Sequence, residues 1–264
     1  MPLIQVFRYF AAQFEMHMKF LGIIPARYGS TRLEGKPLAD INGKPMIQWV
    51  YEKVKLEMDH VYVATDDDRI KNAVEGFGGK VVMTSENHTT GTNRCLEALE
   101  IITEELGIQF DVVVNIQGDE PMIDPEQIHT LKQCFDDKEA ELATLVIPVT
   151  DPKDLMNDSE VFVTFDKHMR ALYFSRAVIP VVHGVKRNEW MNKATFYKHL
   201  GLYAYTTKAL KEFAKLPPSK LEQLEKLEQN RWMENGGTIK IGITEHQSIP
   251  VDTLDDLERI RKII

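Results

Sequence analysis

Residues 23–38 read IIPARYGSTRLEGKPL, and this stretch predicts the fold. It begins as an apolar run, turns at Pro25, and continues as a loop that contains Gly29 and Gly35. The loop carries three cations, Arg27, Arg32 and Lys36. In open α/β sheets, a buried strand that runs into a basic, glycine-containing loop presents backbone N–H groups and positive charge to a polyphosphate. The stretch therefore predicts an α/β fold with a phosphate-binding loop after the first strand.

The loop does not fit the P-loop pattern G-x-x-x-x-G-K-[ST]. Gly29 and Gly35 enclose one residue too many, and Pro37 follows Lys36 where a Ser or Thr would bind magnesium. A kinase or nucleotide hydrolase of the P-loop class is therefore disfavoured.

Composition narrows the possible partners. The chain has 264 residues, of which 43% are hydrophobic, and a net charge of -8. That length allows one large domain, and the acidic balance argues against nucleic-acid binding. No apolar run approaches the about 20 residues of a membrane span, so no membrane insertion is expected. The two cysteines, Cys95 and Cys134, form no paired framework, which favours a reducing, cytoplasmic setting.

Strand-like and helix-like segments alternate over the first half of the chain. Strands are predicted at 19–25, 61–65, 80–84 and 111–116. Helices are predicted at 45–58, 69–76 and 92–106. In the first helix Ile47, Val50 and Val54 share one face. This alternation predicts βαβ units and a mostly parallel sheet.

The pattern changes after about residue 150. Strand-like segments at 160–166, 170–175 and 199–205 follow without regular helices between them, which predicts an antiparallel extension. The next stretch, 219–237, is interpreted as one helix with three inward leucines, Leu221, Leu224 and Leu227. A strand at 238–243 and a capped helix at 253–264 close the chain. Residues 1–18 are interpreted as an extension outside the core, because Arg8 and Glu15 interrupt their apolar part.

Polar residues gather where the predicted strands end, and ligands of open α/β sheets bind there. The cations of the first loop are joined by Asp119 after the fourth strand and by Asp252 after the last apolar run. Cations suit phosphates, and carboxylate oxygens suit Mg²⁺. The combination predicts a nucleoside triphosphate site with a divalent metal.

Nine blocks of the sequence, in this order, resemble the CMP-KDO synthetases, the 3-deoxy-manno-octulosonate cytidylyltransferases. The blocks are PARYGSTRLEGKPL, VATDDDRI, TSENHTTGTNR, VNIQGDEP, ALYFSR, HLGLYAY, SKLEQLEKLEQ, ENG and VDTLDDLE. The resemblance covers residues 19–260. It implies a single domain, 19–264, with a Rossmann-like nucleotidyltransferase sheet and an antiparallel extension, about 150–237, for sugar binding and homodimer formation.

The resemblance also implies a reaction and a site. CTP and a 3-deoxy-octulosonic acid would give the CMP-sugar and pyrophosphate for lipopolysaccharide biosynthesis. Arg27, Arg32 and Lys36 would hold the triphosphate, and Asp119 and Asp252 would bind Mg²⁺. Lys36, Arg32, Asp119 and Asp252 form the implied catalytic set. The implied nucleotide contacts also include Ala26, Gly91, Thr92, Arg94 and Gln117. The implied sugar pocket consists of Gln117, Arg176, His199, Tyr203 and Glu222.

Several of these residues also have a purely structural interpretation. Asp119 could accept hydrogen bonds from turn N–H groups, and Asp252 could merely adjoin the Thr253–Asp256 capping box. Ser219 and Glu222 fit a capping box as well. His199 and Tyr203 could be satisfied core groups of a strand.

Five positions depart from the family pattern: Glu34, Asn93, Phe162, Thr206 and Asn230. Phe162 and Thr206 fall in the sugar-binding half, which leads to the hypothesis that an 8-amino octulosonate is preferred. Three alternatives remain open: a CMP-sialate-type synthetase, a catalytically inactive nucleotide-binding regulatory module, and an oligomerising scaffold that binds no nucleotide.

Overall fold

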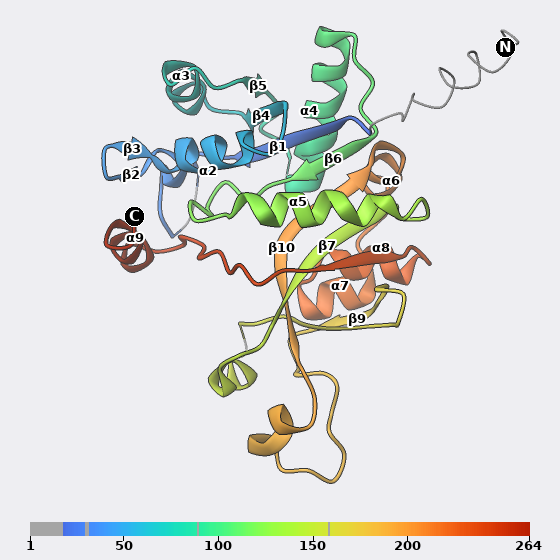
Figure 1. The fold of residues 1–264 in the computed structure, drawn as a ribbon. Coiled ribbons are helices and arrows are strands. Elements are labelled where there is room, and N and C mark those ends of the chain that lie inside the picture. Colours follow the sequence, from blue (N-terminus) through green and yellow to red (C-terminus); the bar gives the residue numbers. More distant parts are fainter. Residues whose placement is uncertain (1–17, 30–31, 89, 158) are drawn as a thin grey trace, which may run out of the picture.

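The computed structural model describes residues 18–29, 32–88, 90–157 and 159–264. Within these residues nine strands form one sheet, whose central path runs β11-β7-β10-β6-β1-β4-β5 (Figure 1). Strands β8 and β9 attach to it through β10. The bounds are β1 Phe20–Ala26, β4 His60–Thr65, β5 Val81–Met83, β6 Val112–Asn115, β7 Leu142–Pro148, β8 Phe162–Phe165, β9 Ala171–Ser175, β10 Tyr197–Thr206 and β11 Ile239–Ile243. A separate two-stranded sheet joins β2 Asp40–Ile41 and β3 Lys44–Pro45.

The sheet is mixed. Strand β1 pairs in parallel with both β4 and β6. The pair β4–β5 and the pair β7–β11 are also parallel. Strand β10 lies antiparallel between β6 and β7, and it also pairs antiparallel with β8. The predicted parallel sheet with an antiparallel extension is therefore confirmed.

Helices cover both faces of the sheet. The α-helices are α2 Met46–Lys55, α3 Asp68–Gly76, α4 Gly91–Leu106, α5 Pro125–Gln133, α6 Thr207–Phe213, α7 Lys220–Glu225, α8 Gln229–Glu234 and α9 Leu254–Arg261. Short 3₁₀ helices are η1 Lys36–Leu38, η2 Cys134–Asp136, η3 Pro152–Met156 and η4 Arg187–Asn192. In β1, Ile24 packs in a core cluster with residues of α2 and α5, while Ile23 packs on the other face with α4 and α6. Burial on both faces explains the continuous apolar run of β1.

One predicted element is wrong. Residues 219–237 form two helices, α7 and α8, because Lys226 adopts a left-handed conformation (φ 56°) between them. The break turns Leu224 outward, where it is 70% exposed, while Leu227 remains buried. Helices α5 and α6 and strand β7 were not predicted from the sequence.

A lobe projects from the sheet, at the bottom of Figure 1. Its residues, 149–196, include β8 and β9, whose Val163 and Phe174 pack in the core of the main sheet. The rest of the lobe forms a small core of its own, made by Val149, Leu155, Phe162 and Phe196. Helices α6 and α8, which follow in the chain, pack instead against the main sheet. Among the described residues, no helix is both long and apolar enough to cross a membrane.

Candidate active site

Lys36 opens η1 at the end of the first loop, and a glycine fixes its position. Gly35 has φ +66°, and a Cβ there would lie 3.0 Å from the ring of Tyr28. The Lys36 ammonium lies 2.6 Å from the Asp119 carboxylate and 3.1 Å from the Asp252 carboxylate. Arg32 reaches the same carboxylate of Asp252 at 3.0 Å. The structure thus brings the four predicted catalytic residues together.

Backbone contacts hold the two carboxylates side by side although they are far apart in the sequence. The Val251 N–H donates to the Asp119 carbonyl at 2.9 Å, which places Asp252 beside Asp119. The turn after β6 passes so close to β1 that a Cβ at Gly118 would lie 3.0 Å from the Pro25 carbonyl oxygen. Asp252 is not used for capping, because Thr253 and Asp256 form the capping box of α9.

The charges in this cluster stabilise each other. Burial alone would lower the pKa of Lys36, but the Asp119 and Asp252 carboxylates outweigh burial and raise it. Both carboxylates point at one cation, so their oxygens suit a hard divalent ion. No group of three or more His, Cys, Asp or Glu side chains is arranged for a metal in the described part of the chain. Two carboxylates that leave coordination positions for phosphates and water match the way Mg²⁺ binds nucleotides.

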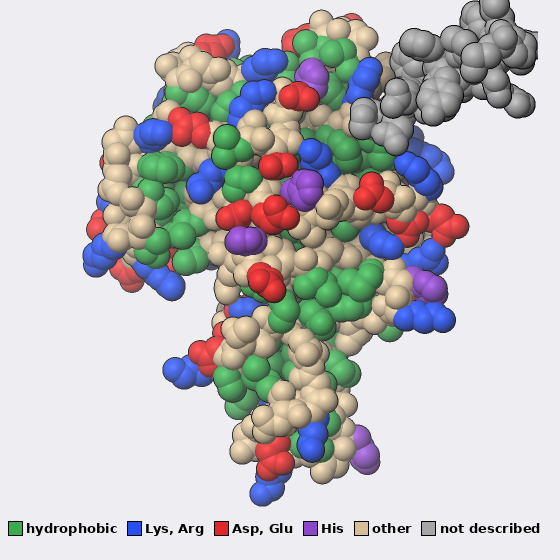
Figure 2. Space-filling view, in the orientation of Figure 1, with side chains coloured by type: hydrophobic (Ala, Val, Ile, Leu, Met, Phe, Trp, Pro, Cys, Tyr) green, Lys and Arg blue, Asp and Glu red, His purple; other side chains and the backbone are tan. Residues whose placement is uncertain are grey.

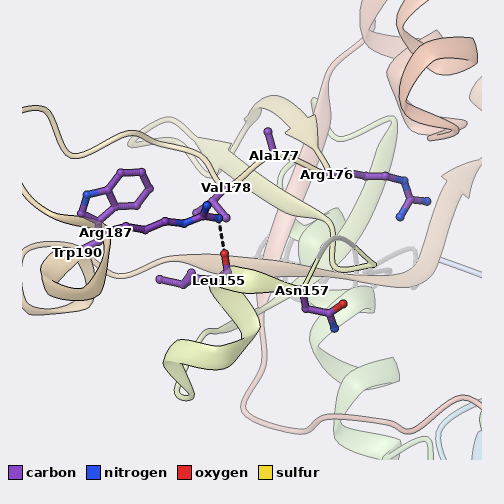
Figure 3. A pocket seen from close by; sticks show the side chains of 7 residues that line it. All are labelled: Leu155, Asn157, Arg176, Ala177, Val178, Arg187 and Trp190. Atoms are coloured by element: carbon purple, nitrogen blue, oxygen red, sulfur yellow. Dashed lines mark hydrogen bonds between the residues drawn. The ribbon is translucent and has the colours of Figure 1, made fainter.

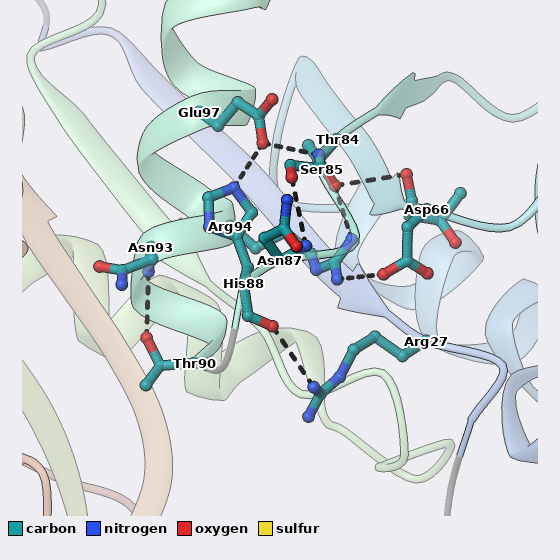
Figure 4. Close-up of polar contacts among 11 residues, drawn as sticks. Arg27, Asp66, Thr84, Ser85, Asn87, His88, Thr90, Asn93, Arg94 and Glu97 are labelled. Atoms are coloured by element: carbon teal, nitrogen blue, oxygen red, sulfur yellow. Dashed lines mark hydrogen bonds and ion pairs between the residues drawn. The ribbon is translucent and has the colours of Figure 1, made fainter.

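The loop between β5 and α4 carries a second polar network (Figure 4). Glu97 accepts the Ser85 N–H at 2.8 Å and also contacts the His88 ring. The Arg27 guanidinium donates to the His88 carbonyl at 3.5 Å, so it links the first loop to this one. The network places Arg27 between the two loops that the resemblance assigns to the nucleotide.

Arg94 lies inside this network. Its side chain is 1% exposed and donates to Thr84 at 2.6 Å and to the Asp66 carboxylate. The structure therefore does not bring the Arg94 side chain to the Lys36 cluster. Its contacts instead tie the end of β4 to α4.

Thr92 and Gly91 open α4 beside a cavity of about 300 Å³. Thr90, Pro218, Glu222, Gln223, Lys226 and Glu228 line this cavity. Thr92 donates to the Glu228 carboxylate at 2.9 Å. Burial raises the pKa of Glu228. The sequence did not single out Glu228 as a candidate site residue. It lies in the repetitive stretch LEQLEKLEQ, where each Glu has similar neighbours.

His199 and Tyr203 lie on β10 with ring centroids 5.3 Å apart. The Thr144 hydroxyl lies 2.7 Å from the Leu202 carbonyl and 2.9 Å from His199 Nε2. Because the hydroxyl donates to the carbonyl, it is left to accept a hydrogen bond from Nε2–H. Although part of its surface is accessible, the surrounding protein desolvates the ring and lowers the pKa of His199 to about 3. His199 is therefore neutral, and it can donate a hydrogen bond but cannot supply a positive charge.

Two amide side chains frame the same part of the sheet. Gln117 donates to the Gly201 carbonyl at 2.9 Å, at an irregularity of β10. The Tyr203 hydroxyl donates to Gln229 at 3.0 Å. Gln117, Tyr203 and Gln229 thus connect the end of β6 to β10 and α8.

Arg176 lies apart from this group. It lines a different cavity, of about 270 Å³, together with residues of the lobe that include Arg187 and Trp190 (Figure 3). Its guanidinium donates to the Glu225 carbonyl at 2.8 Å and to the Ser159 carbonyl at 3.2 Å. The hydrogen bonds of the Arg176 guanidinium thus go to these two carbonyls and not to His199.

The capping interpretation of Glu222 has direct support. The Ser219 N–H donates to the Glu222 carboxylate at 2.9 Å, and Arg231 lies 3.6 Å from it. Glu222 nevertheless lines the cavity that Glu228 also lines.

The departures from the family pattern also have structural places. Phe162 is fully buried in the lobe core, and Thr206 caps α6. Asn230 donates to the Phe174 carbonyl at 3.2 Å. The Asn93 N–H donates to the Thr90 hydroxyl at 3.3 Å, and Glu34 is exposed. Neither Phe162 nor Thr206 lines the cavity beside α4.

The mixed sheet and the cation–carboxylate cluster at its edge define the nucleotidyltransferase class. The family model described as Cytidylyltransferase matches residues 21–241. The chain belongs to the cytidylyltransferase family.

Named relatives match almost the whole chain. A 3-deoxy-manno-octulosonate cytidylyltransferase of Parabacteroides distasonis is 56% identical, covering 92% of this chain and 96% of the relative. An 8-amino-3,8-dideoxy-manno-octulosonate cytidylyltransferase of Shewanella piezotolerans is 50% identical, covering 89% and 94%. A solved structure of CMP:2-keto-3-deoxy-manno-octonic acid synthetase in complex with CTP is 41% identical, with a TM-score of 0.84, and covers 93% of this chain and 98% of that one.

Proposed function

We propose that this protein transfers CMP from CTP to the anomeric hydroxyl of a 3-deoxy-octulosonic acid and releases pyrophosphate, a step of lipopolysaccharide biosynthesis. The observation that carries the proposal is the convergence of Lys36 and Arg32 on Asp119 and Asp252 at the carboxyl end of the sheet. The relatives act, by their names, on octulosonates, and the similar solved structure holds CTP.

The chemistry requires little beyond alignment and charge neutralisation. The anomeric oxygen forms a bond to the α-phosphorus, the bond from that phosphorus to the bridging oxygen breaks, and pyrophosphate leaves. Arg27, Arg32 and Lys36 supply positive charge to the phosphate oxygens. Asp119 and Asp252 would hold Mg²⁺, which when bound neutralises phosphate charge and lowers the pKa of a hydroxyl near it.

The acceptor would lie between β10 and the α7–α8 break. Gln117, His199 and Tyr203 come from the sheet side, and Glu228 comes from the helical side. Because His199 is neutral, the carboxylate of the sugar needs another cation. Arg176 is the candidate that the resemblance supplies, although it must leave its present carbonyl partners to reach this place.

The choice between the unmodified and the 8-amino sugar stays a prediction. Phe162 and Thr206 suggested the 8-amino form, but a core residue and a helix cap do not contact a sugar. The names of the relatives cover both sugars. The places of Phe162 and Thr206 therefore do not support a preference for the 8-amino sugar.

A homodimer and a cytoplasmic location belong to the same proposal. The lobe exposes large apolar side chains, Met156, Leu172 and Val181, and Figure 2 shows hydrophobic surface there. Apolar patches of this kind suit an interface. Both cysteines are free and buried, which suits a reducing compartment.

A pyrophosphate-release assay with CTP and Mg²⁺ tests the reaction. The acceptors would be the octulosonate, its 8-amino form and a sialic acid. We expect release with an octulosonate. Release with the sialic acid alone would make the protein a CMP-sialate-type synthetase. CTP binding without release would favour the regulatory module, and absence of CTP binding would favour the scaffold.

Asp119→Asn separates catalysis from binding in the same assay. We expect kcat to fall about 100-fold or more, with a smaller change in CTP binding, because the charge that organises the metal is lost. Asp255→Asn is the matched control, since Asp255 is an exposed carboxylate three residues beyond Asp252. Full activity of Asp119→Asn would remove Asp119 from the site.

A further inference from the structure

Arg69, at the start of α3, lies against the first loop from outside the site. Its guanidinium carbon is 3.2 Å from the ring centroid of Tyr28. The same guanidinium donates twice to Asp67, from Nε at 3.0 Å and from Nη2 at 2.6 Å. Asp67 is itself fixed, because it caps α3 by accepting the Arg69 N–H at 2.9 Å. The contacts with Asp67 therefore hold the Arg69 guanidinium over the aromatic ring.

Tyr28 in turn contacts Gly35, the residue that precedes Lys36. Its ring lies against Gly35, where a Cβ would meet ring atoms at 3.0 Å and 3.1 Å. Its carbonyl accepts the Gly35 N–H at 2.9 Å. Gly35 in turn is the N-cap of η1, whose first residue is Lys36. Tyr28 thus contacts, through its ring and its carbonyl, the residue at which η1 begins.

We propose that Arg69 is a positioning residue for the nucleotide: by stacking on Tyr28 it fixes Gly35 and η1, and so holds the Lys36 ammonium where it meets the triphosphate. The inference rests on the proposed function, because it assigns Lys36 to the phosphates of CTP. Arg69 itself contacts no reacting atom.

The charges around Arg69 support this role. The hydrogen bonds that the Arg69 guanidinium donates to Asp67 raise the pKa of Arg69, and the nearby Glu34 carboxylate raises it further. Glu34, the unexpected anion of the first loop, therefore acts on Arg69. An arginine suits the place, because only a planar guanidinium can stack on the ring and still donate two hydrogen bonds to one carboxylate.

The test measures CTP binding by calorimetry and steady-state kinetics for both substrates. For Arg69→Ala we expect the Kd and KM of CTP to rise about 2- to 5-fold, the range of an exposed cation–π contact, while the KM of the sugar and kcat stay the same. Arg259→Ala, which removes an exposed arginine of α9, should leave all four quantities unchanged.

Two variants of Tyr28 make the test specific. Tyr28→Phe keeps the ring face and should bind CTP like the wild type, whereas Tyr28→Leu should resemble Arg69→Ala. The double variant Arg69→Ala, Tyr28→Leu should be no weaker than Tyr28→Leu alone, because both changes break one contact.

The proposal would be overturned if Arg69→Ala bound CTP as tightly as the wild type. It would also be overturned if the losses of CTP binding free energy in the two single variants added fully in the double variant. An equal rise in the KM of both substrates would also overturn it, because a general loss of structure would then explain the effect. If the wild type itself binds no CTP, the proposed function fails instead. The two failures are therefore distinguishable.

Discussion

Lys36 is the residue on which the site depends, because two carboxylates share its charge. Each of them is mostly buried, with 26% and 32% of the side chain exposed. Lys36 contacts both Asp119 and Asp252, and its charge offsets the repulsion between the two carboxylates. The same arrangement offers the phosphates an ammonium and offers a metal two oxygen ligands.

Lys36→Met tests both roles. We expect the KM of CTP to rise about 10-fold or more, because a charge-assisted contact to phosphate is lost. We also expect millimolar Mg²⁺ without CTP to raise the Tm of the variant more than that of the wild type, because the ion can then replace the missing cation.

Lys211→Met, at an exposed position of α6, is the control for the loss of a lysine charge. An unchanged KM of CTP would take Lys36 out of the phosphate site. Equal Tm shifts with Mg²⁺ in variant and wild type would show that Lys36 does not occupy the place of the metal.

His199 gives the protein a definite response to acid. The pKa of its imidazole is lowered to about 3 by burial, whereas an unfolded histidine takes up a proton near pH 6.5. Between these values the unfolded chain binds more protons, so this residue lowers stability as the pH falls from about 6.5. Between pH 7 and pH 5 we expect the Tm, measured by circular dichroism, to fall less in His199→Gln than in the wild type.

His246→Gln is the comparison, because His246 is an exposed histidine. The same fall in Tm with pH in His199→Gln and in the wild type would contradict the assignment of a neutral ring.

Glu120 has the opposite effect on stability. Burial raises the pKa of Glu120 to about 7, so its contribution to stability is lost as the pH rises from the unfolded value near 4.5. The comparison must therefore be made between variants and not from the wild-type profile alone.

Among the elements, the break between α7 and α8 has the largest consequence for the site. Lys226 takes φ 56° there, and the turn it makes sets Glu228 against Thr92. A left-handed conformation is costly for a residue with a Cβ, and glycine avoids that cost. A continuous helix over this stretch would place Glu228 differently, so the local conformation of Lys226 shapes the cavity.

Lys226→Gly should therefore raise stability, by up to about 1 kcal/mol, and keep activity. Lys226→Val should destabilise the protein and impair use of the sugar, because a β-branched residue resists this conformation. Urea unfolding and the KM of the sugar measure the two effects. A stabilising Lys226→Val would show that the break is not maintained at this residue.

At the scale of the whole molecule, the lobe has a small core around Phe162 and Phe196, while its residue Phe174 packs in the core of the main sheet. The lobe is small and exposes Leu172 and Val181 at 60% and 68%. A small unit with apolar surface gains stability when a second copy covers that surface. This arrangement favours an interface on the lobe and not on the helices that cover the main sheet.

If the proposed homodimer forms through the lobe, the double variant Leu172→Glu, Val181→Glu should sediment as a monomer while the wild type sediments as a dimer. Leu56→Glu changes an equally exposed leucine at the end of α2 and should leave the dimer intact. A monomeric wild type, or a dimer in which Leu56→Glu is the disruptive change, would refute an interface on the lobe.

The sequence by itself determined the parallel core, because that core depends on local patterns. A run such as VYVAT at 61–65 is apolar on both faces, and Ile47, Val50 and Val54 recur at helical spacing. The cations of the first loop and the two aspartates were also readable, since strand ends collect the polar residues of such sheets. Helix α9 was recognisable from Thr253 and Asp256, which form its capping box.

Only the tertiary structure decided which of these residues contact each other and which of them carry a charge. The hydrogen bond from the Val251 N–H to the Asp119 carbonyl brings Asp252 beside Asp119 from a distant part of the chain, and Arg94 turns inward to Asp66. The charge of His199 follows from desolvation, which no local pattern encodes. The stacking of Arg69 on Tyr28 joins the start of α3 to the first loop, two segments that are far apart in the sequence. Contacts between distant residues and burial depend on how the elements pack, and for that reason the sequence could name the groups of the site but not their partners.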